Sequence, residues 1–209
     1  MGLFKIKKLK KIMLKLHLGC GEIKLKDFVN IDIIQTSAVD RVLDVRKLDY
    51  SDNSVDMIYS AHVLEHFSQK EALPVLKEWY RVLKPGSTAV IVVPNFDRCV
   101  DWYAFRFSFS NFKYLTLGFF KYVLGFKIID LSRELPKNLI YDVMGGGETN
   151  YDYQIYHRTL FNPRSFKNLA QEIGFSRVEP IDLDIKNFPV EGVDPDKLHW
   201  ASMAFTIIK

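Results

Sequence analysis

The run STAVIVVPN at residues 87–95 has no polar side chain between Ala89 and Pro94. A strand with one face in water alternates apolar and polar residues, so this run indicates a strand that is buried on both faces. Such strands are typical of parallel sheets with helices packed on them. Residues 69–86, directly before the run, show apolar residues at helical spacing, and Pro85-Gly86 is the expected stop of that helix.

The rest of the chain alternates in the same way and predicts the remaining elements. A second helix is expected at residues 163–175, with Gly174 as its stop. The expected strands are short and apolar, and they lie at residues 14–18, 28–33, 39–45, 54–61, 176–185 and 200–209. The predicted fold is α/β and doubly wound (Rossmann-like), with a mostly parallel seven-stranded sheet that ends in an antiparallel edge pair.

Two segments depart from this pattern, although the length of 209 residues suits a single domain over 1–209. Residues 1–13 form a basic N-terminal segment with five lysines. Residues 97–150 form an aromatic-rich helical insertion, and the charged residues within 102–131 argue against a membrane span there. We interpret the insertion as a lid or substrate-binding segment. Extra core, a dimer face and a membrane-contacting surface are the other interpretations.

Glycines and carboxylates follow three consecutive predicted strands. Gly19 and Gly21 allow a tight turn after the first strand, Asp32 ends the second and Asp44 ends the third. The carboxyl ends of parallel strands share one edge of the sheet, where ligands bind in doubly wound folds. Asp32 is placed to accept both hydroxyls of a ribose, and Asp44 to accept an adenine amino group. Taken singly, each aspartate would be a turn or cap residue.

A dinucleotide cofactor is disfavoured at this edge. Its fingerprint needs a third glycine, which opens a helix that faces the pyrophosphate. Gly21 is instead followed by EIKLKDF, whose Glu22 would lie close to the phosphates. The pattern favours a ligand without a pyrophosphate.

Four motifs within residues 14–95 resemble those of the class I S-adenosylmethionine-dependent methyltransferases: LHLGCG, VNIDI, LDVRKLDYSDNSVDMIYSAHVLEH and EWYRVLKPGSTAVIVVPN. The segment YHRTLFNPRSFKNLAQEIGF extends the resemblance to about residue 175. The chain is most similar to a compact subgroup, whose members are often encoded in surface-polysaccharide gene clusters and also occur in large DNA viruses that make their own glycans.

The resemblance implies a cofactor site for S-adenosylmethionine. Gly19, Cys20 and Gly21 would cradle the methionine part, Asp32 would bind the ribose, and Asp44 would meet the adenine. The full implied set is Leu18, Gly19, Cys20, Gly21, Asp32, Ile33, Asp44, Val45 and Ala61. The spacing departs from the usual pattern because only ten residues separate Gly21 from Asp32. We therefore expect the helix that usually precedes the second strand to be a single turn or absent. The helix between Asp32 and Asp44 should be reduced as well.

The segment HVLEH at residues 62–66 follows the fourth predicted strand, beside the expected methyl group. In a helical turn, His62, Glu65 and His66 would share one face. The resemblance places a distal His157, in YHRTLF, on a loop that returns over the active site. In one interpretation His66 or His157 is a general base for a hydroxyl acceptor, and an acid such as Glu65 orients it. In another, Glu65 and His66 cap the helix and His62 packs.

A metal site is the third interpretation of the same residues. His62, Glu65, His66 and His157 together are similar to the E-x-x-E-H site with a distal histidine in methyltransferases that act on RNA ribose ends and quinone precursors. His62 stands where that pattern has glutamate. The nitrogen-rich set would favour manganese, zinc or similar ions over magnesium.

The implied function is O-methylation of a sugar hydroxyl of a glycan, for example a deoxyhexose such as rhamnose. A small aromatic, a quinone precursor or an RNA ribose end are alternative acceptors, and a catalytically silent S-adenosylmethionine-binding partner subunit is another alternative. A net charge of only +4 without a basic stripe disfavours long nucleic acid. A homodimer and peripheral membrane contact stay open.

The chain shows no transmembrane pattern, and its only two cysteines, Cys20 and Cys99, are isolated. This favours a reduced, intracellular protein, in the cytoplasm or, for a viral protein, in the host cytoplasm.

Overall fold

The structure is a computed structural model that describes residues 13–98, 158–183, 188–195, 198 and 201–209. The predictions for the basic segment 1–13 and for the insertion 97–150 fall almost entirely outside these ranges. His157 and Cys99 also lie outside the described residues.

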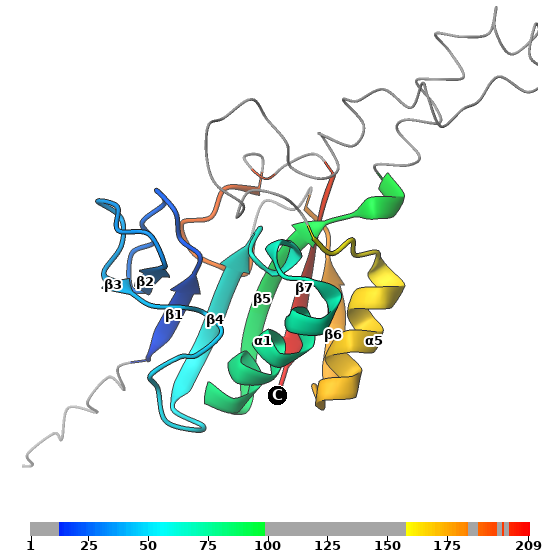
Figure 1. Ribbon diagram of the computed structural model, residues 1–209, viewed down its shortest axis with the longest axis horizontal. Coiled ribbons are helices and arrows are strands. Elements are labelled where there is room, and N and C mark those ends of the chain that lie inside the picture. Colours follow the sequence, from blue (N-terminus) through cyan, green and yellow to red (C-terminus); the bar gives the residue numbers. More distant parts are fainter. Residues whose placement is uncertain (1–12, 99–157, 184–187, 196–197, 199–200) are drawn as a thin grey trace, which may run out of the picture.

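The described residues form one seven-stranded sheet in the order β3-β2-β1-β4-β5-β7-β6 (Figure 1). Strand β7 runs antiparallel to both of its neighbours, and the other pairs are parallel. The strands are β1 (Lys15–Leu18), β2 (Val29–Asp32), β3 (Arg41–Val42), β4 (Val55–Ala61), β5 (Leu83–Pro94), β6 (Arg177–Ile181) and β7 (Ser202–Ile208). This confirms the predicted mostly parallel sheet with an antiparallel pair at one side.

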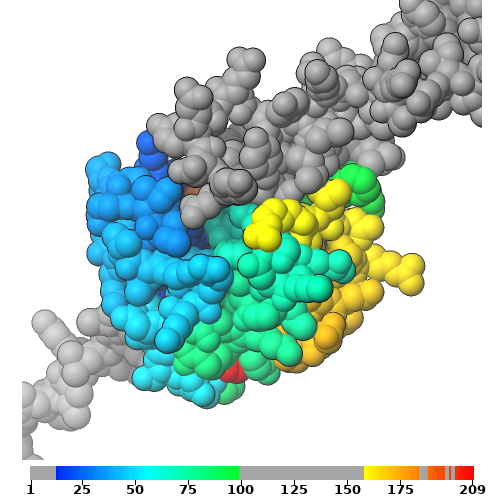
Figure 2. Space-filling view, viewed as in Figure 1, coloured from blue at the N-terminus to red at the C-terminus, as the bar shows by residue number. Residues whose placement is uncertain are grey.

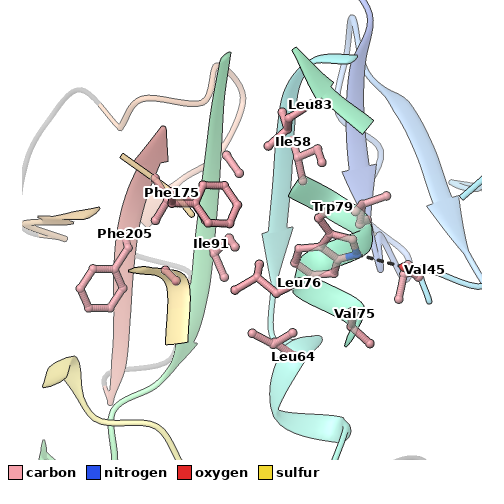
Figure 3. Close-up of a cluster of buried hydrophobic side chains, with 14 of the residues drawn as sticks. Val45, Ile58, Leu64, Val75, Leu76, Trp79, Leu83, Ile91, Phe175 and Phe205 are labelled. Atoms are coloured by element: carbon pink, nitrogen blue, oxygen red, sulfur yellow. Dashed lines mark hydrogen bonds between the residues drawn. The ribbon is translucent and has the colours of Figure 1, made fainter. Parts of the chain in front are cut away.

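Helices α1 (Gln69–Val82) and α5 (Pro163–Ile173) pack on the same face of the sheet (Figure 1). Between them and the strands lies the larger core, in which Leu76 of α1 points toward Ile91 and Trp79 lies beside Ile58 and Val45 (Figure 3). Gly174 ends α5 in the left-handed conformation, at φ 114°, as predicted. Neither helix has the length and apolar character that crossing a membrane requires, and the described residues contain no other candidate.

The predicted end of the helix at residues 69–86 is wrong. Helix α1 stops at Val82, and the chain continues directly into β5 at Leu83, so that Pro85 and Gly86 lie inside a strand. The residue before a proline avoids the helical conformation, which forces the helix to end ahead of Lys84. The pairing of β5 with β4 is irregular here, and Gly86 adopts a φ of 77°.

The opposite face of the sheet is covered differently. The structure describes every residue between β1 and β4, and this stretch contains no α-helix, as the short spacing predicted. Loop residues Leu25 and Phe28 pack there on Tyr59 and Val90, together with Val190 from the segment before β7. Loop packing therefore replaces helix packing on this face.

The chain segments before and after the insertion meet at the carboxyl end of β5. Asn95 forms a parallel bridge with Phe161, and the Phe96 N–H donates to the Phe161 carbonyl at 2.9 Å. The returning chain also contacts the start of α1, since the Thr159 hydroxyl donates to the Phe67 carbonyl at 2.6 Å. In the space-filling view, the yellow segment that begins at residue 158 lies against the teal surface around α1 (Figure 2).

Candidate functional site

The turn after β1 is tied to the end of β2. The N–H groups of Gly19 and Cys20 both donate to the Ile31 carbonyl, at 2.8 and 3.0 Å. Gly19 and Gly21 adopt positive φ values of 69° and 53°, which side chains disfavour. The two glycines are therefore required by the backbone geometry of this turn.

Asp32 closes the same turn from β2. Its Oδ2 accepts from the Gly21 N–H at 2.8 Å, and its Oδ1 accepts from the Ile34 N–H at 3.0 Å. The residue is only partly buried. A carboxylate oxygen can accept more than one hydrogen bond, so Asp32 keeps acceptor capacity toward a ligand with paired hydroxyls.

The turn also contacts the segment after β4. A Cβ added to Gly19 would clash with Cγ2 of Val63, whereas a Cβ added to Gly21 would meet no atom of the described residues within 4 Å. Val63 thus occupies the place of a side chain at position 19, and the space beside Gly21 is open. Open space beside a glycine turn allows a ligand to approach the backbone closely.

Asp44 lies beyond β3 at the same edge. The Arg46 Nε donates to its Oδ2 at 2.8 Å and to its Oδ1 at 3.0 Å, and this guanidinium lowers the pKa of Asp44. Neighbouring Val45 is buried, and its carbonyl accepts from Trp79 Nε1 at 3.0 Å (Figure 3). Helix α1 therefore fixes the loop that carries Asp44.

The other residues of the implied cofactor set differ in what they can offer a ligand. Leu18 is fully buried in the core, so only its backbone faces the edge. Cys20 is also buried, and burial, with Asp32 nearby, raises the pKa of its thiol to about 11. Ile33 is 48% exposed beside Asp32 and offers an apolar surface. Ala61 ends β4 and is half-buried.

The HVLEH segment is not the expected helical turn. Only Leu64–His66 are helical, as a short 3₁₀ turn η1, and α1 begins after Ser68. His62 precedes the turn with a φ of 55°, in the left-handed region that non-glycine residues rarely adopt. The three side chains consequently do not share one helical face, although His62 and Glu65 still meet.

His62 lies between two buried side chains. Its Nδ1 is 3.0 Å from Glu65 Oε1, and its Nε2 is 3.0 Å from the hydroxyl of Ser202 at the start of β7. Glu65 and Ser202 are both fully buried. Nothing in the sequence pointed to Ser202, because it lies 140 residues from His62 and only the sheet order brings it there.

Glu65 also holds the chain that returns from the insertion. Its carbonyl accepts from the N–H groups of Arg158 and Thr159, at 2.7 and 3.1 Å. His157, the predicted distal histidine, directly precedes this contact but lies outside the described residues. Within the described ranges, no group of three histidine, cysteine or acidic residues is arranged to hold a metal ion.

The segment that forms this edge of the sheet is similar to a known protein family. Residues 16–91 match the family model described as a methyltransferase domain. No curated protein matches the chain.

Solved structures match over nearly the whole chain at low identity. A SAM-dependent methyltransferase from Archaeoglobus fulgidus is 14% identical with a TM-score of 0.53, covering 94% of this chain and 86% of its own. One from Methanosarcina mazei is 16% identical with a TM-score of 0.51, covering 100% and 97%. A chain of the Haloferax volcanii complex between the Trm112 methyltransferase activator and a methyltransferase is 14% identical with a TM-score of 0.50, covering 96% and 84%.

The chain has the Rossmann-like methyltransferase fold. The likeness to the solved structures shows the fold, and the family match covers residues 16–91 of the chain. The matched residues 16–91 contain the glycine turn, Asp32, Asp44 and the HVLEH segment.

The residues at the carboxyl edge of the sheet fit the S-adenosylmethionine site that the sequence resemblance implies. Gly21 leaves open space, Asp32 offers acceptor oxygens for a ribose, and Ile33 offers an apolar surface beside it. Asp44 fits an adenine amino group less directly, because Arg46 already binds both of its oxygens. A second hydrogen bond to either oxygen is compatible with that pair.

Proposed function

We propose that the chain is an S-adenosylmethionine-dependent O-methyltransferase that acts on a sugar hydroxyl of a glycan, such as a deoxyhexose, in the cytoplasm. The observation that carries the methyl-transfer part is the contact between Gly19 and Val63. It brings the cofactor turn directly against the segment that holds His62, Glu65 and His66. The compact spacing from Gly21 to Asp44, shared with methyltransferases of polysaccharide clusters, supports the glycan acceptor.

The cofactor-binding residues have separate tasks in this proposal. The backbone of Gly19, Cys20 and Gly21 surrounds the methionine part, and Asp32 binds the ribose hydroxyls. Asp44 and Val45 meet the adenine, with Val45 held in place by Trp79. Ala61 borders the cofactor at the end of β4.

Transfer to a hydroxyl requires a group that takes the proton. The bound cofactor supplies an activated methyl group and its own leaving group, so the protein aligns the acceptor and accepts a proton. His66, which lies in η1 directly after Glu65, is the first candidate for this base. His157 is the second candidate for this role. Glu65 positions the segment through His62 and through its carbonyl.

Incubation with methyl-labelled S-adenosylmethionine and a panel of glycosides, catechols and RNA fragments tests the acceptor. We expect mass spectrometry to find a methyl ether on a sugar hydroxyl. Transfer only to a catechol or an RNA ribose would contradict the glycan assignment. Cofactor binding without transfer to any acceptor would instead support the silent partner subunit.

Chelation tests the metal-dependent form of the proposal, in which His62, Glu65, His66 and His157 hold a divalent ion. His62 would have to give up one of its two hydrogen bonds to bind the ion. We therefore expect methyl transfer to continue in EDTA. Activity that is lost in EDTA and restored by manganese or zinc would show that these residues bind metal.

A further inference from the structure

Ser202 connects β7 to the site through a chain of three side chains. The residue begins the strand and is fully buried, and its hydroxyl lies 3.0 Å from His62 Nε2. On the other side of the ring, Nδ1 lies 3.0 Å from the buried Glu65. Ser202 is neither one of the proposed cofactor-binding residues nor the proposed general base, so its role is still to be explained.

The direction of the hydrogen bonds follows from the chemistry of the three groups. When the Glu65 carboxylate accepts the first of these hydrogen bonds, the donated proton is on His62 Nδ1. In the neutral ring Nε2 is then an acceptor, and the Ser202 hydroxyl donates to it. The serine and the carboxylate together fix one tautomer and one orientation of the ring.

The two hydrogen bonds of the His62 ring also hold its backbone in a strained conformation. A φ of 55° costs a non-glycine residue free energy and persists only where the surroundings hold it. The next residue, Val63, fills the place of a side chain at Gly19, since its Cγ2 would clash with an added Cβ. A shift of the backbone at His62 would therefore move Val63 and, through it, the glycine turn.

We propose that Ser202 is a positioning residue for cofactor binding, which acts through His62 and Val63 on the Gly19 turn. The residue is fully buried, so its effect on a ligand at the turn would pass through its neighbours. The inference rests on the proposed function, because the ligand of the turn is taken to be S-adenosylmethionine.

Titration calorimetry with S-adenosylmethionine tests this role. We expect Ser202→Ala to weaken binding roughly five- to tenfold, as the loss of one buried hydrogen bond does. Thr206→Val is the matched control, since Thr206 lies four residues along β7 on the same face and also loses a hydroxyl. Its affinity should equal that of the wild type. A Ser202→Ala protein that melts earlier but binds with unchanged affinity would overturn the proposal.

A double-mutant cycle tests the route through His62. Asparagine tolerates the left-handed conformation, so His62→Asn removes the ring contacts with little added backbone strain. If Ser202 acts through His62, the double variant binds no more weakly than His62→Asn alone. Additive losses would contradict the route. If Ser202→Ala does not fold, Ser202→Cys takes its place, since a thiol is a poor donor of similar size.

These outcomes are distinct from a failure of the proposed function. A wild-type protein that does not bind S-adenosylmethionine refutes the cofactor assignment itself. Normal wild-type binding with unaffected Ser202 variants refutes only the positioning role.

Discussion

Gly19 and Gly21 both have a positive φ, but among the described residues a side chain would meet a neighbour at Gly19 and none at Gly21. Gly21→Ala should cost about 1 kcal/mol of folding free energy, from backbone strain alone. Gly19→Ala should cost more, because Val63 must also move, and both substitutions should weaken cofactor binding. Urea unfolding and calorimetry measure the two effects.

The double variant Gly19→Ala/Val63→Ala provides the control for this explanation. Removing Cγ2 of Val63 frees the space that the new methyl group needs. We expect the double variant to regain part of the affinity lost in Gly19→Ala. If the double variant regains none of the affinity lost in Gly19→Ala, Val63 does not set the position of the turn.

His17 gives the protein a pH-dependent stability. Burial lowers the pKa of His17 from 6.5, against smaller opposing effects of Asn30 and Asp32, and its ring packs on Tyr59. The unfolded chain binds a proton near pH 6.5 and the folded chain does so only at lower pH. The stability due to His17 is therefore complete above about pH 6.5 and is lost as the pH falls toward the folded pKa.

We expect the free energy of unfolding to fall between about pH 7 and 5.5, and to fall less in His17→Gln. Urea unfolding at several pH values measures both slopes. The other histidines are common to both proteins, so the difference reports His17 alone. Equal slopes would show that His17 is not the group responsible.

At the level of elements, the loop between β1 and β2 is held by one buried asparagine in place of a helix. Asn30 Oδ1 accepts from the Leu25 N–H at 2.9 Å and lies 3.0 Å from His17 Nδ1. Its Nδ2 donates to the carbonyls of Leu25 and Phe28 and to Asp40. The side chain thus replaces backbone hydrogen bonds that a helix would have made.

Asn30→Ala should destabilise the protein by about 3 kcal/mol, because it leaves several buried groups without partners. Asn168→Ala, at an exposed position of α5, is the matched control and should change the stability little. Urea unfolding measures both. A small effect at Asn30 would mean that the loop is held by the apolar packing of Leu25 and Phe28 alone.

The strands could be predicted because each buried strand is a short apolar run. The absence of a helix before β2 could be predicted because the ten residues between Gly21 and Asp32 are too few for a helix and a strand. The end of α1 was misplaced because Leu83 continues the helical spacing while Pro85 restricts the backbone before it. The left-handed conformation of His62 and its contact with Ser202 depend on the order of distant strands. No local pattern encodes them.

For the whole molecule, the described site has two halves of different origin. The glycine turn, Asp32 and Asp44 follow successive strands, so sequence order alone places them on one edge. The histidine half is closed by segments far along the chain, namely Ser202 on β7 and the backbone of residues 158–159. This explains why the sequence could predict that the glycine turn, Asp32 and Asp44 share one edge of the sheet, but could not predict the surroundings of His62.

The central claim is that the carboxyl edge of the sheet binds S-adenosylmethionine through Asp32. Asp52 offers a matched control, since it is exposed and lies before β4, at the opposite edge. Titration calorimetry of the wild type, Asp32→Ala and Asp52→Ala tests the claim most directly. We predict binding by the wild type and by Asp52→Ala, and a loss of at least about 100-fold in Asp32→Ala. A wild type that does not bind, or an Asp32→Ala protein that binds as well as the wild type, would contradict it.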